Sequence, residues 1–237
     1  MIVRGNNIIT PGFAVRNDSG IKKVADLKGK RVAYGYAGSL IAQQILTALL
    51  DINGLSWDDV KKVPVTDILS AVKMLQDNQV DAVFGLTPHT PVMLEVNNSV
   101  PLKGLNALDQ YTPDQINSIP QSITDKLHSY VPGTEWSLMK KDEYIRQDQI
   151  AINYATLLLT STHLSDDTVY SITQTLWNNY KDLQPIHDWL KSWDPQQMFD
   201  PNPVIPYHPG AVKFFKDQGV WTDQAQKVQD ELLKSVQ

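Results

Sequence analysis

The strongest constraint on the fold of this chain is an alternation of strand-like and helix-like segments in its N-terminal half. Mostly apolar runs of strand length at residues 31–35, 60–65 and 80–86 are each followed by a segment with apolar residues at helical spacing. A further strand is expected at residues 12–16, between turn-forming residues. This order predicts an α/β domain with a mostly parallel sheet that is covered by helices on both faces.

Capping residues mark the ends of these predicted helices. Ser39 is expected to cap the first helix and Thr66 the second, and Asn53-Gly54 is expected to close the first. Further along, the apolar, threonine-containing segment at residues 151–160 favours a strand. From Ser165 onward the spacing of apolar residues predicts helices joined by loops.

Composition excludes several classes of function. The net charge of −5 is spread along the chain, which argues against a nucleic-acid-binding protein with a basic stripe. There are no cysteines, so disulfides, thiolate metal sites and a cysteine nucleophile are excluded. No apolar run approaches the ~20 residues of a membrane-spanning helix, and the first residues contain no signal-peptide core. No cofactor is expected.

Two strand-end loops are predicted to form a ligand-binding crevice. In open α/β sheets, ligands bind at the carboxyl ends of the strands, where residues 36–39 and 87–90 both fall. The helix after Gly38 would offer unpaired N–H donors and partial positive charge at its N-terminus, which suits a carboxylate, sulfonate or phosphate. The predicted ligand-binding residues are Tyr36, Gly38, Ser39, Leu40, Thr87, Pro88 and Thr90.

Each of these residues also has a purely structural interpretation. Gly38 and Ser39 could form an ordinary connection with a good cap, with no ligand involved. Tyr36 could stack on the ligand or donate a hydrogen bond to it, or it could fill the interface between lobes. Thr87 and Thr90 could contribute hydroxyls to the crevice or cap the following helix, and Pro88 would shape the loop.

Other residues that could suggest chemistry are interpreted structurally. Asp81 lies in an apolar strand and is expected to anchor a loop by hydrogen bonds. Asp166 and Asp167 are adjacent first-turn charges that point in different directions and suit the helix dipole. His208 is expected to form loop hydrogen bonds and to cap the helix after it. No metal site is expected, because the histidines follow no ligand spacing: His89, His128, His163, His187 and His208.

Segments spread over nearly the whole chain resemble the TAXI family of solute receptors, which serve TRAP-type transporters. The stretch DLKGKRV at residues 26–32 is common to many binding proteins, whereas two late segments are much closer to TAXI receptors. The segments that carry the resemblance are Gly20-Ile21, residues 26–32, Gly38-Ser39, residues 80–84 (VDAVF), residues 164–170 (LSDDTVY), residues 208–215 (HPGAVKFF) and residues 219–221 (GVW).

The resemblance implies a type II periplasmic-binding-protein fold, in which two lobes close over a solute between helix N-termini. It implies a remnant leading into the hinge at residues 1–11 and an α/β ligand-binding lobe at residues 12–150. Residues 151–237 would form the hinge return and the C-terminal helical part of the first lobe. The N-terminal part of that lobe, with its glycine-rich ligand loop, and a signal sequence are not found in this chain, so an incomplete first lobe is expected.

The resemblance further implies a periplasmic or otherwise extracytoplasmic receptor that performs no chemistry. Its solute would be glutamate or a related amino acid or dicarboxylate, and its partners would be TRAP membrane permease subunits. An alternative is a small enzyme on the same fold, such as a dehydratase or a pyrimidine-precursor synthase, which would need a polar catalytic cluster. A regulatory ligand-sensing module would need a DNA-binding or signalling domain, which this sequence lacks.

Overall fold

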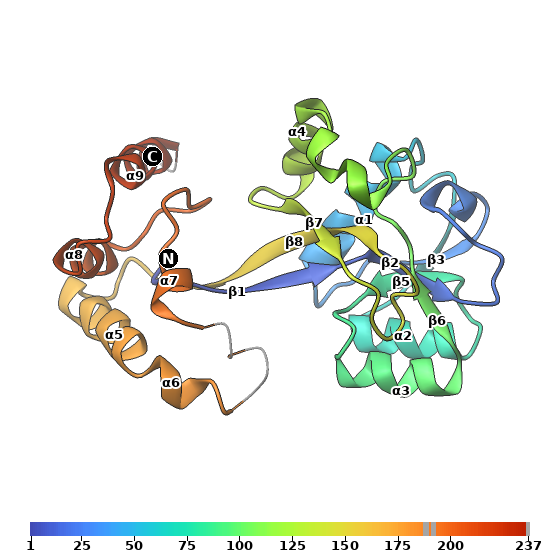
Figure 1. Ribbon diagram of the computed structural model, residues 1–237, viewed down its shortest axis with the longest axis horizontal. Helices are drawn as coiled ribbons and strands as arrows, with labels where there is room; N and C mark the ends of the chain where they lie inside the picture. Colours follow the sequence, from blue (N-terminus) through green and yellow to red (C-terminus); the bar gives the residue numbers. More distant parts are fainter. Residues whose placement is uncertain (187–189, 191–192, 236–237) are drawn as a thin grey trace. The chain divides into compact units, whose positions relative to one another are not determined.

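The chain divides into two compact units. The computed structural model describes residues 1–186, 190 and 193–235, so His187 lies outside the described residues. Unit 1 comprises Met1–Ile8 and Ala155–Gln237, and unit 2 comprises Ile9–Tyr154. The chain passes between the units within two strands, β1 and β8 (Figure 1). The assignment of these units to the lobes of a receptor stays a prediction.

Strands and helices follow one another largely as the sequence predicts, and the strand expected at residues 151–160 is confirmed as β8. The strands are β1 (Val3–Thr10), β2 (Gly12–Arg16), β3 (Arg31–Tyr34), β4 (Lys61–Pro64), β5 (Ala82–Gly85), β6 (Leu102–Gly104), β7 (Glu135–Met139) and β8 (Gln149–Leu158). The α-helices are α1 (Leu40–Ile52), α2 (Ile68–Gln76), α3 (Pro91–Ser99), α4 (Gln121–Tyr130), α5 (Asp166–Asn178), α6 (Tyr180–Leu183), α7 (Pro195–Met198), α8 (Pro209–Asp217) and α9 (Asp223–Ser235). Unit 2 also contains the short 3₁₀ helices η1 (Val24–Leu27) and η2 (Pro113–Ser118).

The central element of unit 2 is a five-stranded sheet with the order β4-β3-β5-β2-β6. β3 pairs in parallel with β4 and β5, whereas β2 pairs antiparallel with β5 and β6. Four strands therefore share one direction and β2 alone runs the other way. The predicted α/β class is confirmed, and the reversal of β2 is a feature that the order of segments did not predict. A second sheet has the order β1-β8-β7.

Helices cover both faces of the five-stranded sheet. The connection through α1 steps from β3 outward to β4, and the connection through α2 steps back to β5, so right-handed crossovers place α1 and α2 on opposite faces. Figure 1 shows α2 and α3 side by side below the sheet, while α4 packs on α1. Because both faces are covered, β5 is buried along its whole length.

The helix starts differ in detail from the sequence prediction. α1 begins after Ser39, but the Ser39 side chain makes no capping hydrogen bond. The prediction that Thr66 caps α2 is wrong: the cap is Asp67, whose carboxylate accepts a hydrogen bond from the N–H of Ser70 at 2.8 Å. A carboxylate satisfies this N–H and complements the helix dipole better than a hydroxyl one residue earlier. Gly54, with φ +80°, follows the end of α1 as predicted.

Unit 1 packs its helices around aromatic side chains. α5 and α8 lie against each other, and the ring of Phe214 on α8 meets the rings of Tyr170 and Trp177 on α5 with centroids 5.5 and 5.7 Å apart. Ser165, where the sequence predicts that the helical part begins, accepts a capping hydrogen bond at the start of α5, and the predicted His208 cap at the start of α8 is confirmed. Edge-to-face ring pairs of this kind stabilise the contact beyond the burial of area alone.

Asp81 forms anchoring hydrogen bonds, as the sequence predicts, but it lies just before β5 and anchors the start of β3, not a loop. Its carboxylate accepts hydrogen bonds from the N–H of Arg31 at 2.7 Å and from the Arg31 guanidinium at 2.7 and 3.2 Å. Partial burial raises the pKa of Asp81, but the hydrogen bonds from Arg31 outweigh it and hold this pKa below the usual value. The depressed pKa means that the carboxylate is stabilised in the folded chain.

This ion pair predicts a pH-dependent stability. A carboxyl group whose pKa is lowered by folding contributes stability above its unfolded pKa of about 4, and this contribution is lost as the pH falls through the folded value. We therefore expect Asp81→Asn to lower the urea midpoint at pH 7 and to flatten the loss of stability between about pH 5 and pH 3. Urea titrations across this range, with the exposed Asp114→Asn as control, test it. Equal pH profiles for wild type and Asp81→Asn would contradict the prediction.

Candidate functional site

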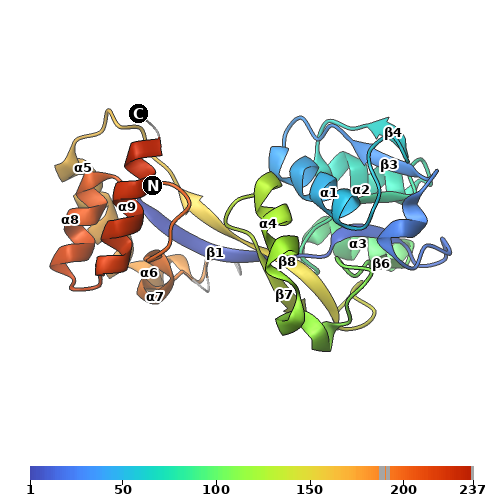
Figure 2. The same ribbon diagram turned by 90° about the horizontal axis from the view of Figure 1, so that it is seen from above.

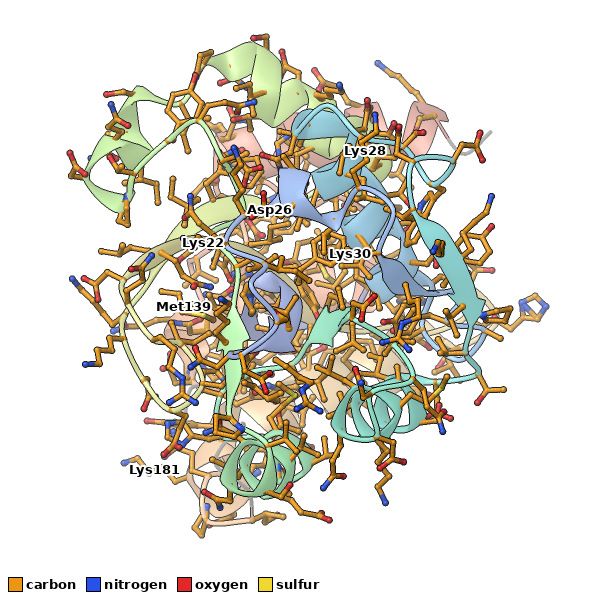
Figure 3. All side chains as sticks on the ribbon, turned by 90° about the vertical axis from the view of Figure 1, so that its right-hand side faces the viewer. Lys22, Asp26, Lys28, Lys30, Met139 and Lys181 are labelled. Atoms are coloured by element: carbon orange, nitrogen blue, oxygen red, sulfur yellow. The ribbon has the colours of Figure 1, made fainter. Side chains whose placement is uncertain are left out.

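The candidate site lies at one edge of the five-stranded sheet. β3, β4 and β5 are parallel, so their carboxyl ends meet at the same edge, and each leads directly into the N-terminus of α1, α2 or α3 (Figure 2). The lysines around η1 are not part of this edge: Lys22, Lys28 and Lys30, labelled in Figure 3, precede β3 and so belong to its amino end. These three lysines therefore do not supply positive charge to the candidate site.

The backbone of residues 36–39 is held by its own hydrogen bonds. The N–H of Gly38 donates to the carbonyl of Thr66 at 2.9 Å, and the N–H of Ser39 donates to the carbonyl of Tyr36 at 2.7 Å. The expectation that these two N–H groups are free is therefore wrong. The bond from Gly38 to Thr66 also joins the loop after β3 to the loop after β4, which fixes the start of α1.

Three donors at the start of α1 remain unused among the described residues. The N–H groups of Leu40 and Ile41 have no acceptor in this part of the chain, and the hydroxyl of Ser39 neither caps the helix nor bonds elsewhere. Leu40 is exposed, and Ser39 and Ile41 are half-buried. An N-terminus with unpaired donors attracts an anionic group, because the helix dipole adds partial positive charge at the same point.

The start of α2 differs from the start of α1 in charge. The Asp67 carboxylate sits at the N-terminus of α2, accepts hydrogen bonds from Ser70 and Thr66, and its pKa is lowered by them. A bound anion would be repelled by this carboxylate. Of these two neighbouring helix starts, α1 is therefore the one that suits an anionic ligand.

Tyr36 supports the loop from inside unit 2. Its side chain is fully buried, and its hydroxyl accepts a hydrogen bond from the N–H of Phe84 in β5 at 2.8 Å. Burial raises the pKa of Tyr36, so the hydroxyl stays protonated. The backbone of Tyr36 has φ +25°, an unusual value that this interior contact stabilises. Contact between the Tyr36 ring and a ligand stays a prediction.

The loop after β5, residues 86–90, presents a pair of hydroxyls. Thr87 Oγ1 and Thr90 Oγ1 lie 2.8 Å apart, and the N–H of Thr90 donates to the carbonyl of Thr87 at 3.0 Å. Pro88 occupies the second position of this turn, which its fixed φ favours. Thr90 precedes α3 but its side chain makes no capping hydrogen bond. The two half-buried hydroxyls can therefore reach a ligand at the sheet edge.

Comparison with known proteins identifies the family. A model described as the NMT1-like family matches residues 9–219, which is most of the chain. The chain belongs to the NMT1-like family. This match does not reach the narrower TAXI family, so membership of that family stays a prediction.

Several solved structures with some similarity to this NMT1-like chain have titles that name solute-binding proteins. The periplasmic aliphatic sulphonate binding protein SsuA from Escherichia coli is 16% identical, with 84% of this chain and 70% of that chain covered and a TM-score of 0.35. The alkanesulfonate-binding protein SsuA from Xanthomonas axonopodis pv. citri, bound to MOPS, is 15% identical, with 94% and 71% covered and a TM-score of 0.39.

A third structure is the substrate binding protein of an amino acid ABC transporter, at 14% identity and a TM-score of 0.32. The match covers 99% of this NMT1-like chain but 62% of that protein, which is less than two thirds of its length. At such TM-scores and identities, the three structures do not indicate which solute this chain binds.

Two residues of a short turn next to the site were missed by the sequence analysis. Tyr144 donates a hydrogen bond from its hydroxyl to the carbonyl of Leu86, and Asp142 Oδ2 lies 2.7 Å from Nε2 of His89. Both contacts hold the 86–90 loop of this NMT1-like chain. The only sequence signal was an apolar pair, Tyr144-Ile145, inside a charged stretch, which is typical of a buried anchor in a surface loop.

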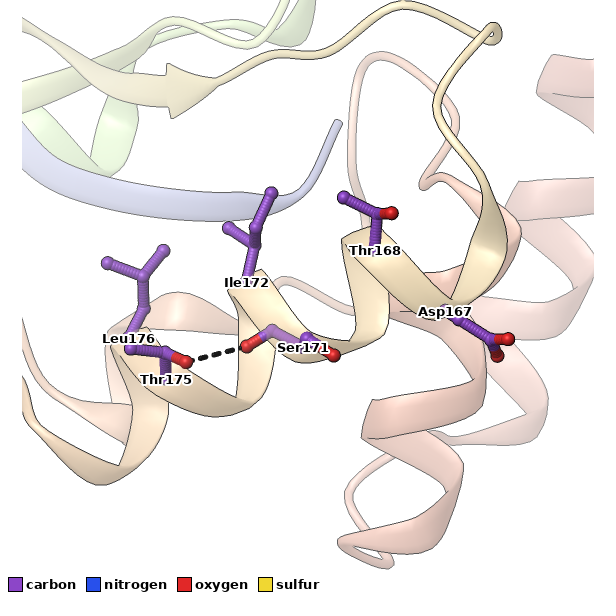
Figure 4. A pocket seen from close by; sticks show the side chains of 6 residues that line it. All are labelled: Asp167, Thr168, Ser171, Ile172, Thr175 and Leu176. Carbon is purple, nitrogen blue, oxygen red and sulfur yellow. Dashed lines mark hydrogen bonds between the residues drawn. The ribbon is translucent and has the colours of Figure 1, made fainter.

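Unit 1 contains a surface hollow of about 580 Å³ along α5, lined by one face of the helix (Figure 4). Its lining includes Ile172, Leu176 and Thr175, and the Thr175 hydroxyl donates to the backbone carbonyl of Ser171 at 2.8 Å. None of the predicted ligand-binding residues belongs to this hollow, since all lie in unit 2.

Residues 1–186, 190 and 193–235 contain neither a metal-binding cluster nor a membrane-spanning helix. No set of three or more His, Cys, Asp or Glu side chains in this part of the chain is arranged to hold a metal ion. Within the same ranges, no helix has the length and hydrophobicity needed to cross a membrane.

Proposed function

We propose that this NMT1-like chain is a solute-binding protein that acts outside the cytoplasm, captures a small anionic solute at the start of α1 and passes it to a membrane transporter. The observation that carries the proposal is the group of three unused donors, Ser39 Oγ and the N–H groups of Leu40 and Ile41. These donors lie at the carboxyl ends of the parallel strands β3, β4 and β5, where ligands of open α/β folds bind. Unit 2 is then the ligand-binding lobe.

Binding without chemistry is favoured by the surroundings of the hydroxyl groups. A serine or threonine nucleophile needs a base that takes its proton. Among the described residues, the Ser39 hydroxyl bonds to no histidine or carboxylate, and the Thr87 hydroxyl bonds to Thr90. These groups are suited to hold oxygen atoms of a solute and lack the partner that would activate them.

The narrower proposal concerns the solute and the transporter. Glutamate or a related amino acid or dicarboxylate is the proposed solute, and TRAP permease subunits of the TAXI type are the proposed partners, on the resemblance described above. Surface plasmon resonance with purified TRAP permease subunits, with and without the solute, tests the partner. Absence of binding in both conditions would contradict it.

A ligand screen tests the proposed function directly. The chain is heated in the presence of L-glutamate, succinate, ethanesulfonate and inorganic phosphate, and hits are measured by calorimetry. A ligand at a hundred times its Kd stabilises the folded chain by about 2.7 kcal/mol, so at least one compound is expected to raise the Tm clearly. A neutral analogue, such as L-glutamine for L-glutamate, is the control for charge. No stabilising anion, together with chemical turnover of one compound, would favour the enzyme alternative.

A further inference from the structure

A tight turn at residues 142–145, called here the 142–145 turn, is fixed to the body of unit 2. The N–H of Asp142 donates to the carbonyl of Ile145 at 3.0 Å, and the N–H of Ile145 donates back to the carbonyl of Asp142 at 2.7 Å. The carbonyl of Tyr144 accepts a hydrogen bond from the N–H of Gly104 in β6 at 3.1 Å. Tyr144 and Ile145 are fully buried. The turn is therefore a rigid part of the unit.

The Tyr144 side chain holds the first residues of the 86–90 loop. Its hydroxyl donates to the carbonyl of Leu86, and burial raises the pKa of Tyr144, so the donor stays protonated. A Cβ atom placed on the preceding Gly85 would lie 3.0 Å from the Tyr144 hydroxyl and 2.9 Å from Cγ of Pro11. The end of β5 therefore fits closely between Pro11 and Tyr144.

Asp142 holds the other end of the same loop. Asp142 Oδ2 and His89 Nε2 lie 2.7 Å apart, although both side chains are largely exposed, at 45% and 68%. Along the chain, Thr87 lies between these two attachments and Thr90 directly follows the second one, and their hydroxyls are 2.8 Å apart. The 142–145 turn thus contacts the 86–90 loop near both ends of the loop.

We propose that Asp142 and Tyr144 are positioning residues that hold the 86–90 loop in the conformation that binds solute. This inference rests on the proposed function, because it assigns the loop a role in that site. A loop that is already ordered loses less conformational freedom on binding, so its hydroxyls contribute more to affinity. If the two residues served packing alone, their hydrogen bonds could be removed without a change in the loop.

The first test uses the full chain without ligand and measures hydrogen exchange of the Thr90 amide by NMR, because this amide bonds to Thr87 inside the loop. Tyr144→Phe and Asp142→Ala each remove one attachment and are expected to speed this exchange about fivefold or more. Asp142→Asn keeps an oxygen acceptor for His89 and is expected to restore slow exchange. Tyr130→Phe is the matched control, since it removes a tyrosine hydrogen bond to Asp51 in the same unit.

The second test measures affinity for L-glutamate and ethanesulfonate by calorimetry in the same variants. Tyr144→Phe and Asp142→Ala are expected to bind the better of these probes about fivefold more weakly, with Asp142→Asn and Tyr130→Phe close to wild type. If wild type binds a probe but Thr90 exchange is unchanged in Tyr144→Phe and Asp142→Ala, the positioning role is overturned. Failure of Asp142→Asn to rescue overturns the role of the His89 contact.

The two tests separate failure of the inference from failure of the proposed function. If the wild-type chain binds neither probe, this result counts against the proposed function. The exchange measurement still tests the positioning role, because it is made without ligand. Faster exchange with unchanged affinity overturns the link between the loop and the solute. If Tyr144→Phe does not fold, the exposed Asp142 variants carry both tests.

Discussion

Gly210→Ala is expected to destabilise unit 1 by about 3 kcal/mol, because the new side chain would overlap a backbone atom that cannot move aside. A Cβ on Gly210 would lie 2.1 Å from the carbonyl oxygen of Asp166 and 2.9 Å from its carbonyl carbon. Gly210 stands in the first turn of α8, and Asp166 begins α5, so the methyl group would force the two helices apart. Their separation would also loosen the contact of Phe214 with the rings on α5.

A matched control distinguishes this clash from the general cost of replacing glycine. Gly219 lies in the same unit and follows α8, and a Cβ there meets nothing within 4 Å, although its φ is +71°. Gly219→Ala is expected to cost about 1 kcal/mol from backbone strain alone. Urea denaturation followed by tryptophan fluorescence measures both variants. An equal loss of stability in the two variants would show that α5 and α8 can move apart at little cost, which would contradict the prediction.

Much of the fold was predictable because its signals are local. Apolar runs and helical spacing come from residues near one another in sequence, so the alternating strands and helices of unit 2 were found. The helix start at Ser165 and the His208 cap were found for the same reason. The direction of β2 (Gly12–Arg16) was not predicted, because it depends on the strands with which β2 pairs. These strands, β5 and β6, lie far along the chain.

The location of the candidate site could be predicted from the sequence, but the hydrogen bonds made by its residues could not. The Gly38-Ser39 step marks the start of α1 correctly, yet the N–H of Gly38 is used by Thr66, which belongs to another loop. That contact has no counterpart in the local sequence. Tyr36 illustrates the same limit, because its aromatic ring could equally face a ligand or the interior, and only the distant Phe84 places it in the core.

The positioning contacts from the 142–145 turn depend on tertiary structure in the same way. His89 and Asp142 are separated by more than fifty residues, and neither follows a motif that links them. The 142–145 turn and the 86–90 loop bring the two side chains within hydrogen-bond distance at the rim of the site. No catalytic or metal-binding spacing in the sequence therefore links these two residues.

Leu40→Pro is expected to weaken binding of the anionic solute about tenfold or more while leaving α1 intact. Proline is favoured at the first position of a helix, where its missing N–H has no partner inside the helix. The substitution therefore removes one of the unused donors and little else from the backbone. A hydrogen bond to a charged group contributes about 1.5–3 kcal/mol, and each 1.4 kcal/mol corresponds to a tenfold change in Kd.

Leu40→Ala separates the role of this N–H from that of the exposed leucine side chain. Alanine keeps the donor and removes most of the side chain, so its affinity for the anion found in the ligand screen is expected to stay within about threefold of wild type. Calorimetry gives the two affinities, and circular dichroism with the Tm checks that α1 is preserved. Equal affinities for Leu40→Pro and Leu40→Ala would mean that the solute does not bind the N–H of Leu40, which would contradict the role proposed for this donor. The N–H of Leu40 would then be satisfied by water.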